Sequence, residues 1–298
     1  MKNRKIKKII VPVAGLGTRM LPATKAIPKE MLPIVNKPLI QYIIEEIVYA
    51  GFEEVILVTH SSKYSIENHF DQSFELENTL KKRLKRAMLK EIKGISKLKV
   101  SLQSIRQGEA KGLGHAILCA QKIIGKEPFA IALPDMLISK ENGLNGKSLK
   151  EMKENYERNE LSSVLLGKVK KEKISSYGIV KLKKDKKYSS LGFIEKIIEK
   201  PPQKKAPSNL YAVGRYIFNN DLFNYLGKVK PDKSGEIQLT DAIDLYINKG
   251  NDVLGYLLDG DIYDCGEKTE FILANIDFAI RDSSISKIIK KNLKIKLF

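Results

Sequence analysis

The chain has 298 residues, of which 43% are hydrophobic and 30% charged, and its formal net charge is +18 at pH 7. This apolar content is ordinary for a globular protein and excludes a chain that is disordered throughout. The length allows one large α/β domain or two smaller ones, each with a sizeable core.

The positive charge comes mainly from lysines that are spread evenly along the sequence. This distribution is more typical of a solvated surface than of a nucleic-acid groove, and the chain has no Trp to stack on a base. No segment approaches the roughly 18 consecutive apolar residues of a membrane helix. We therefore expect neither a nucleic acid nor a membrane as partner, although a basic surface attracts anionic nucleotides and sugar phosphates.

The two cysteines, Cys119 and Cys265, lack the spacing of a metal site, and two thiols make a poor disulfide framework. We interpret both as reduced thiols. The basic N-terminus leads directly into a short strand, without the apolar region of a cleavable leader. These features predict a cytoplasmic protein.

The first predicted strand, residues 8–13, is rich in β-branched residues and ends at small ones. It is followed by residues 14–33, which we call the first loop. Gly15 and Gly17 can adopt positive φ and leave room for backbone N–H groups around phosphate oxygens. The loop also carries three cations: Arg19, Lys25 and Lys29. Its prolines restrict the backbone, so the pattern predicts a binding loop for a polyphosphate.

Two familiar phosphate motifs do not fit the first loop. Met20 stands where a dinucleotide fingerprint needs its third glycine, and no Gly-x4-Gly-Lys-Ser/Thr run occurs in the chain. The loop resembles instead the G-x-G-T-R signature of sugar-phosphate nucleotidyltransferases. Its longer form, residues 17–33, is similar to bacterial UTP–glucose-1-phosphate uridylyltransferases in particular: GTRMLPATKAIPKEMLP.

This resemblance implies roles for six residues of the first loop. The nucleotide-binding residues are Ala14, Gly15, Gly17 and Thr18, and the catalytic residues are Arg19 and Lys29. The residues alone leave one alternative open, which is a glycine-rich turn with solvated charges.

Helices and strands alternate after the first loop. Helical spacing of apolar residues predicts a helix over residues 38–50, and an apolar run predicts a strand over 55–59. A second helix is expected from near Ser65, then a long basic helical stretch over 74–95 and a strand over 99–105. Strand–helix–strand units of this kind favour a largely parallel sheet.

Residues 106–116 join the third strand to a helix predicted over residues 116–124. An amide side chain beside flexible backbone can read a uracil edge, because pyrimidine recognition needs paired donors and acceptors. The resemblance implies that Gln107 and Gly112 contact the base. A glycine-rich helix entry without a ligand is the alternative, and we assign no catalytic role to His115.

Asp135 follows an apolar strand predicted over residues 129–133, at the edge where α/β sheets bind ligands. Mg²⁺ favours carboxylate and phosphate oxygens, so Asp135 is a candidate metal ligand, with a capping role as the alternative. The family pattern D-x-G implies Asp264 as a second ligand. Asp259 and Asp261 are then interpreted as turn residues.

Strands predicted over residues 162–169, 178–182 and 192–198 suggest a small antiparallel, lid-like subdomain that binds the sugar. The resemblance implies that Gly178 lets the hexose approach. Two Glu-Lys pairs follow, and the family's E-K-P pattern selects the pair before Pro201. A further strand is predicted over residues 212–218, and its Val-Gly-Arg-Tyr resembles the family's sugar-pocket strand. The resemblance therefore implies five residues that bind the sugar phosphate: Gly178, Glu199, Lys200, Val213 and Gly214. Thr240 is interpreted as the cap of a helix that ends near residue 249.

The resemblance extends from residue 9 to about residue 281. It implies a nucleotide-diphosphosugar transferase fold, a Rossmann-like three-layer α/β sandwich with a mixed, mostly parallel sheet. We expect a catalytic domain over residues 6–282 and a basic tail over 283–298, which could be a helix, an oligomer contact or disordered.

The implied reaction is UTP plus α-D-glucose 1-phosphate giving UDP-glucose and pyrophosphate, with Mg²⁺ as cofactor and a homodimer or homotetramer as the assembly. The sequence leaves open dTTP or another hexose phosphate as substrate. A sugar-nucleotide sensor without catalysis and a nucleic-acid-binding protein are the alternatives from other classes.

Overall fold

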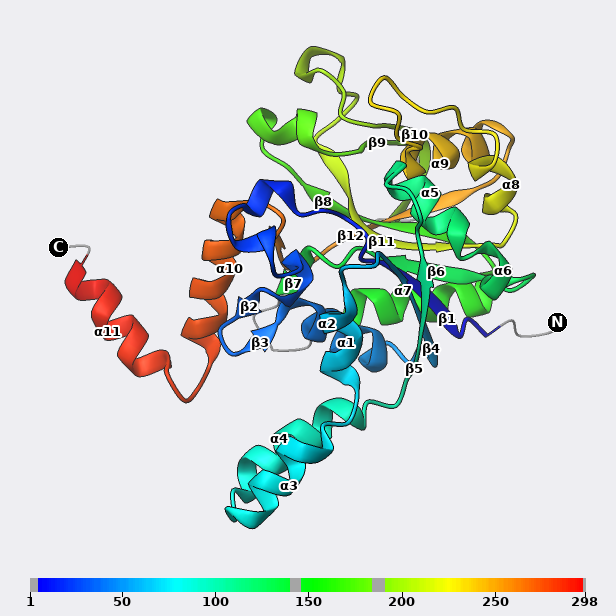
Figure 1. Ribbon diagram of the computed structural model, residues 1–298. Coiled ribbons are helices and arrows are strands. Elements are labelled where there is room, and N and C mark those ends of the chain that lie inside the picture. The colour runs from blue at the N-terminus through cyan, green and yellow to red at the C-terminus, as the bar shows by residue number, and fades with distance from the viewer. Residues whose placement is uncertain (1–4, 140–145, 184–190, 297–298) are drawn as a thin grey trace.

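The computed structural model describes residues 5–139, 146–183 and 191–296, so the first basic residues and the end of the predicted tail lie outside the described ranges. The central element is a sheet whose strands are, in chain order, β1 (Lys8–Pro12), β4 (Glu54–Thr59), β5 (Ser101–Arg106), β6 (Phe129–Ala132), β8 (Ser162–Lys168), β9 (Ile179–Leu182), β10 (Leu191–Ile198), β11 (Leu210–Phe218) and β12 (Val253–Leu257). Their order across the sheet is β5-β4-β1-β6-β11-β8-β12-β10-β9 (Figure 1).

The sheet is mixed, as predicted, but it is not mostly parallel. Strands β5, β4, β1 and β6 are parallel, and so are β8 and β12. The other four neighbouring pairs in this order are antiparallel. No α-helix lies between β8 and β11 in the described part of the chain, so no helical crossover returns the chain to a parallel direction there.

The strands predicted to form a separate antiparallel lid are instead part of the central sheet. Besides its place at the edge, β9 pairs with β11, so β11, β8, β12, β10 and β9 form a closed ring of strands. A register shift in β11 between Ala212 and Tyr216 surrounds Gly214, whose φ is +88°. This bulge bends β11, and its two halves have different partners: β9 at its start and β6 at its end.

Helices cover both faces of the sheet, which is the three-layer arrangement that was predicted. One core lies under α1, α2 and α7, and the other lies under α5, α6, α8 and α9. The helices are α1 (Leu39–Tyr49), α2 (Tyr64–Phe70), α3 (Phe74–Lys82), α4 (Arg86–Ser96), α5 (Gly112–Cys119), α6 (Gln121–Ile124), α7 (Lys147–Asn159), α8 (Leu222–Leu226), α9 (Leu239–Asn248), α10 (Lys268–Arg281) and α11 (Ser286–Lys296). None of the helices in the described ranges is long and apolar enough to cross a membrane.

The basic stretch predicted over residues 74–95 is helical, but it is divided into two helices, α3 and α4. The break between α3 and α4 falls at Leu84, which has a φ of +52° and an exposed side chain. Neither Gly nor Pro marks this position, so the turn could not be predicted from local residue types. Figure 1 shows the resulting hairpin projecting from the body of the molecule.

Two small sheets complete the fold beside the central one. β7 (Met136–Ser139) pairs antiparallel with β13 (Asp261–Asp264), and β2 (Pro33–Ile34) pairs with β3 (Lys37–Pro38). Near the C-terminus α11 packs on α10 and extends outward in Figure 1. The predicted tail is therefore helical over residues 286–296.

Candidate active site

A cleft of about 790 Å³ opens where β1, β5 and β6 end. The carboxyl ends of parallel strands meet at one edge of a sheet, which is the usual position of a ligand site in such folds. The first loop leaves β1 at this edge, Gln107 follows β5, and Asp135 lies just beyond β6. Predicted site residues that line the cleft are Ala14, Gly15, Gly17, Thr18, Arg19, Lys29, Gln107, Gly112, Asp135, Gly178, Glu199, Lys200 and Asp264.

The first loop is folded into three short 3₁₀ helices, Thr18–Met20, Ala23–Lys25 and Lys29–Met31. Gly17 begins the first of them with a φ of +68°, and its carbonyl accepts a hydrogen bond of 2.7 Å from Thr24 Oγ1. A Cβ at Gly17 would lie 3.3 Å from side-chain atoms of both Lys29 and Thr24. Positive φ and close packing together explain the glycine at this position.

Lys29 reaches across the cleft to Asp135, with 2.6 Å between Nζ and Oδ2. Both side chains are largely buried, being 16% and 15% exposed. Burial alone would lower the pKa of Lys29, but the charges of Asp135 and Glu30 and the hydrogen bond to Asp135 together leave the pKa above its ordinary value. Burial likewise opposes ionisation of Asp135, but Lys29, a backbone hydrogen bond and the charge of Arg19 together lower the pKa of that carboxyl. Both groups are therefore charged at neutral pH.

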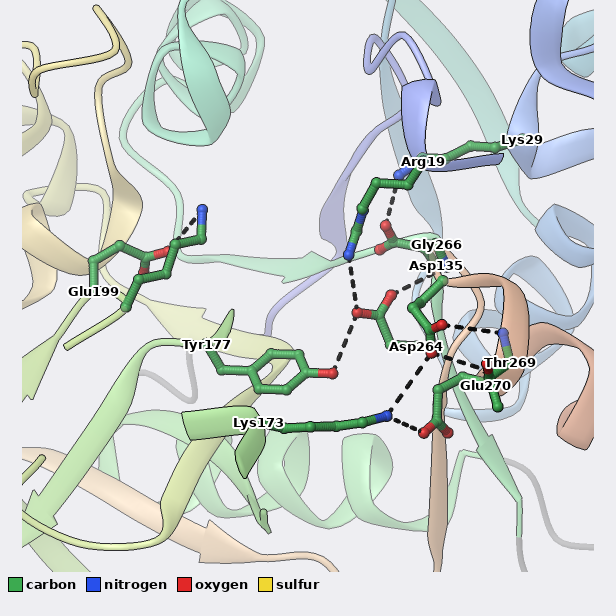
Figure 2. Close-up of polar contacts among 12 residues, drawn as sticks. Arg19, Lys29, Asp135, Lys173, Tyr177, Glu199, Asp264, Gly266, Thr269 and Glu270 are labelled. Atoms are coloured by element: carbon green, nitrogen blue, oxygen red, sulfur yellow. Dashed lines mark hydrogen bonds and ion pairs between the residues drawn. The ribbon is translucent and has the colours of Figure 1, made fainter. Parts of the chain in front are cut away.

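Asp264 lies between two further side chains (Figure 2). Its Oδ2 is 3.4 Å from Arg19 Nη1 and accepts a hydrogen bond of 3.3 Å from the Tyr177 hydroxyl. Burial and the negative charge of Asp135 raise the pKa of Asp264, against the opposing effect of Arg19. Arg19 itself is 59% exposed, so its guanidinium remains accessible from the cleft.

The two aspartates are held together by backbone as well as by charge. Cys265 N–H donates a hydrogen bond of 2.8 Å to the Asp135 carbonyl, and Met136 is paired with Asp264 between β7 and β13. A Cβ on Gly266 would lie 2.7 Å from Arg19 Nη2, 3.0 Å from Asp264 Oδ1 and 3.1 Å from Asp135 Oδ2. Both carboxylates and the Arg19 guanidinium therefore converge on the space beside Gly266, which is too small for a side chain at that position.

This donor set fits a hard divalent cation that takes its remaining ligands from elsewhere. Mg²⁺ is commonly bound by one or two carboxylates together with phosphate oxygens and water. Within the described ranges, no cluster of three or more His, Cys, Asp or Glu side chains could hold a metal by itself.

Asp261 is a strand residue and not the turn residue that was predicted. It begins β13, and its Oδ2 lies 3.8 Å from Arg281 Nη2.

Gln107 is a buried residue in the lining of the cleft. Its Nε2 donates to the Gly112 carbonyl at 3.2 Å and lies 3.0 Å from His115 Nδ1. The helix predicted from residue 116 begins at Gly112, which places His115 in its first turn. A Cβ on Gly112, where φ is +85°, would lie 2.8 Å from Glu236 Cβ. Close packing against the segment before α9 therefore requires this glycine.

Glu199 and Thr240 meet on the side of the cleft formed by β10 and α9. Thr240 Oγ1 donates a hydrogen bond of 2.9 Å to Glu199 Oε2, and Lys200 Nζ lies 3.5 Å from Glu199 Oε1. The prediction that Thr240 caps α9 is wrong, because Gln238 holds the cap position and the Thr240 hydroxyl is engaged by Glu199. A Cβ on Gly178 would lie 2.7 Å from Thr240 Cγ2, so Gly178 permits this contact.

Val213 and Gly214 are not brought to the lining of the cleft. The Val213 side chain is buried in the core beneath α1 and α7, and a Cβ on Gly214 would lie 2.8 Å from Leu133 Cβ. Their predicted contact with the sugar stays a prediction, and only their backbone could make it.

A model of the nucleotidyl transferase family matches residues 8–279. The chain belongs to this family. It is 46% identical over 289 residues to a UTP–glucose-1-phosphate uridylyltransferase of Escherichia coli strain K12, covering 95% of this chain and 93% of that protein. A UTP-bound UGPase from Acinetobacter baumannii matches 97% of this chain and 98% of its own, at 40% identity and a TM-score of 0.87.

A UDP-glucose pyrophosphorylase complexed with UDP-glucose matches 92% of this chain and 98% of its own, at 41% identity and a TM-score of 0.81. The resemblance inferred from the first loop and the later motifs is therefore confirmed.

The structure of this nucleotidyl transferase also contains a buried ion pair that the sequence did not indicate. Lys63 Nζ lies 2.8 Å from Glu30 Oε2, and the side chains are 5% and 0% exposed. Glu30 directly follows Lys29, and Lys63 precedes α2, so the pair ties the first loop to the turn after β4. Burial raises the pKa of Glu30, and its Oε1 has no hydrogen-bond partner among the described residues.

Other neighbours of the predicted residues were also missed. Figure 2 shows that Tyr177 contacts Asp264 and that Lys173 forms an ion pair of 2.5 Å with Glu270 beside Asp264. His115 contacts Gln107. These contacts join residues that are distant in sequence or on separate turns, so local spacing carries no signal for them. Only the placement of Tyr177 beside Gly178 gave a hint.

Proposed function

We propose that this nucleotidyl transferase moves the uridylyl group of UTP onto α-D-glucose 1-phosphate, giving UDP-glucose and pyrophosphate. The observation that carries the proposal is the pairing of Lys29 with Asp135 and of Arg19 with Asp264 in one cleft. Nucleotidyl transfer needs positioning and neutralisation of charge more than it needs a protein nucleophile. The names and near-complete coverage of the relatives support these two substrates.

The first loop would bind the triphosphate through Ala14, Gly15, Gly17 and Thr18. An oxygen of the sugar phosphate attacks the α-phosphorus, and the bond between the α-phosphorus and the bridging oxygen of the pyrophosphate breaks. Arg19 and Lys29 stabilise the negative charge that develops on the leaving pyrophosphate. Each cation contacts a carboxylate that lines the cleft, so each cationic group lies at the cleft as well.

Asp135 and Asp264 would hold Mg²⁺ in the space beside Gly266. A bound divalent cation supplies charge neutralisation for phosphate oxygens. The support is the convergence of both carboxylates and the raised pKa of Asp264, because a cation between them relieves their repulsion.

Gln107 and Gly112 are proposed to recognise the uracil, with the Gln107 amide fixed by its contact with His115. Gly178 and Glu199 are proposed to bind the hexose and Lys200 to bind its phosphate. The partial exposure of Glu199 and its hydrogen bond from Thr240 support this assignment. Backbone contacts from Val213 and Gly214 complete the proposal.

The test is release of pyrophosphate with UTP, dTTP, CTP or GTP, each combined with glucose 1-phosphate or galactose 1-phosphate. We expect turnover with UTP and glucose 1-phosphate to exceed every other combination, and to be lost when EDTA replaces Mg²⁺. A preference for dTTP or for the galactose compound would overturn the substrate assignment. Turnover unaffected by EDTA would overturn the proposed requirement for Mg²⁺.

The chain is further proposed to act in the cytoplasm as a homodimer or homotetramer. The location is supported by the two free thiols, and the assembly by exposed apolar side chains on α10 and α11 beside a groove of about 690 Å³. Light scattering coupled to gel filtration measures the assembly, and a monomeric mass at micromolar concentration would contradict it.

A further inference from the structure

Arg215 is fully buried and makes five hydrogen bonds, one for each of its N–H groups. It lies on β11, directly after the bulge at Gly214. Nε and Nη2 donate to the two carboxylate oxygens of Glu46 on α1, at 2.8 and 2.7 Å. Glu46 is 1% exposed, so the two charges compensate each other inside the core.

The remaining N–H groups of Arg215 point to backbone on both sides of Asp135. Nη1 donates to the Leu133 carbonyl at 3.1 Å and to the Gly214 carbonyl at 3.3 Å, and Nη2 donates to the Met136 carbonyl at 2.9 Å. The carbonyl of Asp135 itself is held by Cys265 N–H. The turn from Leu133 to Met136 is therefore fixed on both sides of the residue whose side chain enters the cleft.

We propose that Arg215 is a positioning residue for this transferase, which holds the Asp135 carboxylate at the distance from Asp264 that metal binding requires. Glu46 orients the guanidinium and compensates its charge. The inference rests on the proposed metal site and deepens it. Neither Arg215 nor Glu46 lines the cleft, so both act through the backbone of the turn and not on the substrate.

Two physical points separate this role from general stabilisation. A buried ion pair is often replaceable by apolar residues without loss of stability, so its presence needs another reason. Moreover, only a planar guanidinium can engage a carboxylate through two nitrogens and still reach two carbonyls that flank one residue. Lysine would keep the charge and lose that geometry.

The test compares the parent protein with Arg215→Lys and with the double variant Glu46→Met/Arg215→Met. Mn²⁺ binding in the presence of UDP-glucose is measured by electron paramagnetic resonance, and kcat and KM are measured separately. We expect both variants to bind Mn²⁺ about 10- to 100-fold more weakly, which is the usual effect of losing a residue that orients a metal ligand. UTP binding in EDTA should be unchanged.

Phe223→Leu is the matched control, because Phe223 is buried against Phe129 on the other face of the sheet. It should lower the melting temperature without changing the Mn²⁺ affinity. A folded double variant with Mn²⁺ affinity and kcat within about twofold of the parent would overturn the inference, since losing a residue that orients a metal ligand has a larger effect. If the double variant does not fold, Arg215→Lys decides by the same criterion.

The parent protein distinguishes failure of this inference from failure of the proposed function. A parent that binds Mn²⁺ with UDP-glucose but releases no pyrophosphate from UTP and glucose 1-phosphate refutes the function, and the variants still test the positioning. A parent that binds no Mn²⁺ overturns the inference itself.

Discussion

Lys29 serves two purposes at the residue scale, because it compensates a buried carboxylate and offers a cation to the cleft. Its ammonium lies 2.6 Å from Asp135 Oδ2, and both side chains are mostly buried. Loss of the ammonium would leave Asp135 without its counter-charge, and burial would then raise the pKa of that carboxyl. The proposed phosphate binding and the ionisation of Asp135 are thus linked through one side chain.

Replacing Lys29 by Ala should lower kcat by about 10²- to 10³-fold, by analogy with the loss of one group that stabilises transition-state charge. Pyrophosphate release measures the effect, and cooperative unfolding in urea checks that the variant still folds. Lys126→Ala is the control, because Lys126 is exposed and outside the cleft, and its removal changes the net charge equally. Parent-like turnover of Lys29→Ala would remove Lys29 from the mechanism.

Thr240→Val should raise the KM for glucose 1-phosphate about twofold to tenfold, which corresponds to the loss of one hydrogen bond of about 0.5–1.5 kcal/mol. The Thr240 hydroxyl holds Glu199, so Glu199 loses its orientation in the variant. Steady-state kinetics should leave the KM for UTP unchanged. Thr240→Ser keeps the hydroxyl and should restore the parent value, and an equal effect of both variants would contradict the role.

Site residues could be predicted where several of them lie close together in the sequence or directly follow a recognisable strand. The glycines and cations of the first loop fall in one segment, and Asp135 follows an unmistakable apolar strand. The contact between Thr240 and Glu199 could not be found in this way, because it depends on how α9 packs against β10. Arg215 was equally hidden, since its partners lie on α1 and on the turn after β6.

At the scale of elements, the first loop depends on an anchor outside itself. The buried pair of Glu30 and Lys63 joins its last 3₁₀ helix to the turn before α2. Lys29 lies between this anchor and the cleft, so the pair limits how far Lys29 can move.

Lys63→Met should lower the free energy of unfolding by about 3–5 kcal/mol, the usual cost of leaving one buried charge without its partner. Urea unfolding at pH 7 measures this change. Lys7→Met is the control, because the ion pair of Lys7 with Glu53 is exposed and its loss should change the free energy of unfolding little.

The stability deficit of Lys63→Met should also shrink as the pH falls. The pKa of Glu30 is raised by burial in the folded protein, so the folded state binds its proton more readily than the unfolded state. The free energy of unfolding therefore gains from protonation of Glu30 as the pH falls through that raised pKa. Without Lys63 the pKa of Glu30 is higher still, so the variant gains this stability at a higher pH than the parent does. Unfolding curves from pH 8 to pH 5 test it, and a deficit independent of pH would contradict the explanation.

Elements were predictable where local pattern decides them. The helix α1 formed as predicted because Ile40, Ile43, Ile44 and Ile47 lie on one helical face and are fully buried. The turn between α3 and α4 was not, since Leu84 adopts positive φ without a Gly or Asn to mark it. The prediction of a mostly parallel sheet failed after β8 for a different reason, because the pairing partners of a strand are set by the whole sheet.

For the whole molecule, the net charge of +18 should affect how fast substrates arrive. Screening shortens the reach of this field from about 30 Å at 0.01 M salt to about 10 Å at 0.1 M. We expect kcat/KM for UTP to fall over this range while kcat stays nearly constant. Potassium chloride titration of initial rates measures it, with the uncharged solute sucrose as a control for viscosity, and a flat profile would contradict electrostatic attraction.

The pairing of β7 with β13 joins Asp135 to a carboxylate that the ribosome adds much later. A nascent chain that has passed β6 already contains every cation of the first loop, yet it lacks Asp264, the proposed second metal ligand, until β13 emerges and pairs with β7. The proposed metal site is therefore completed only after β13 has been synthesised, and we expect translation products that stop before β13 to be inactive.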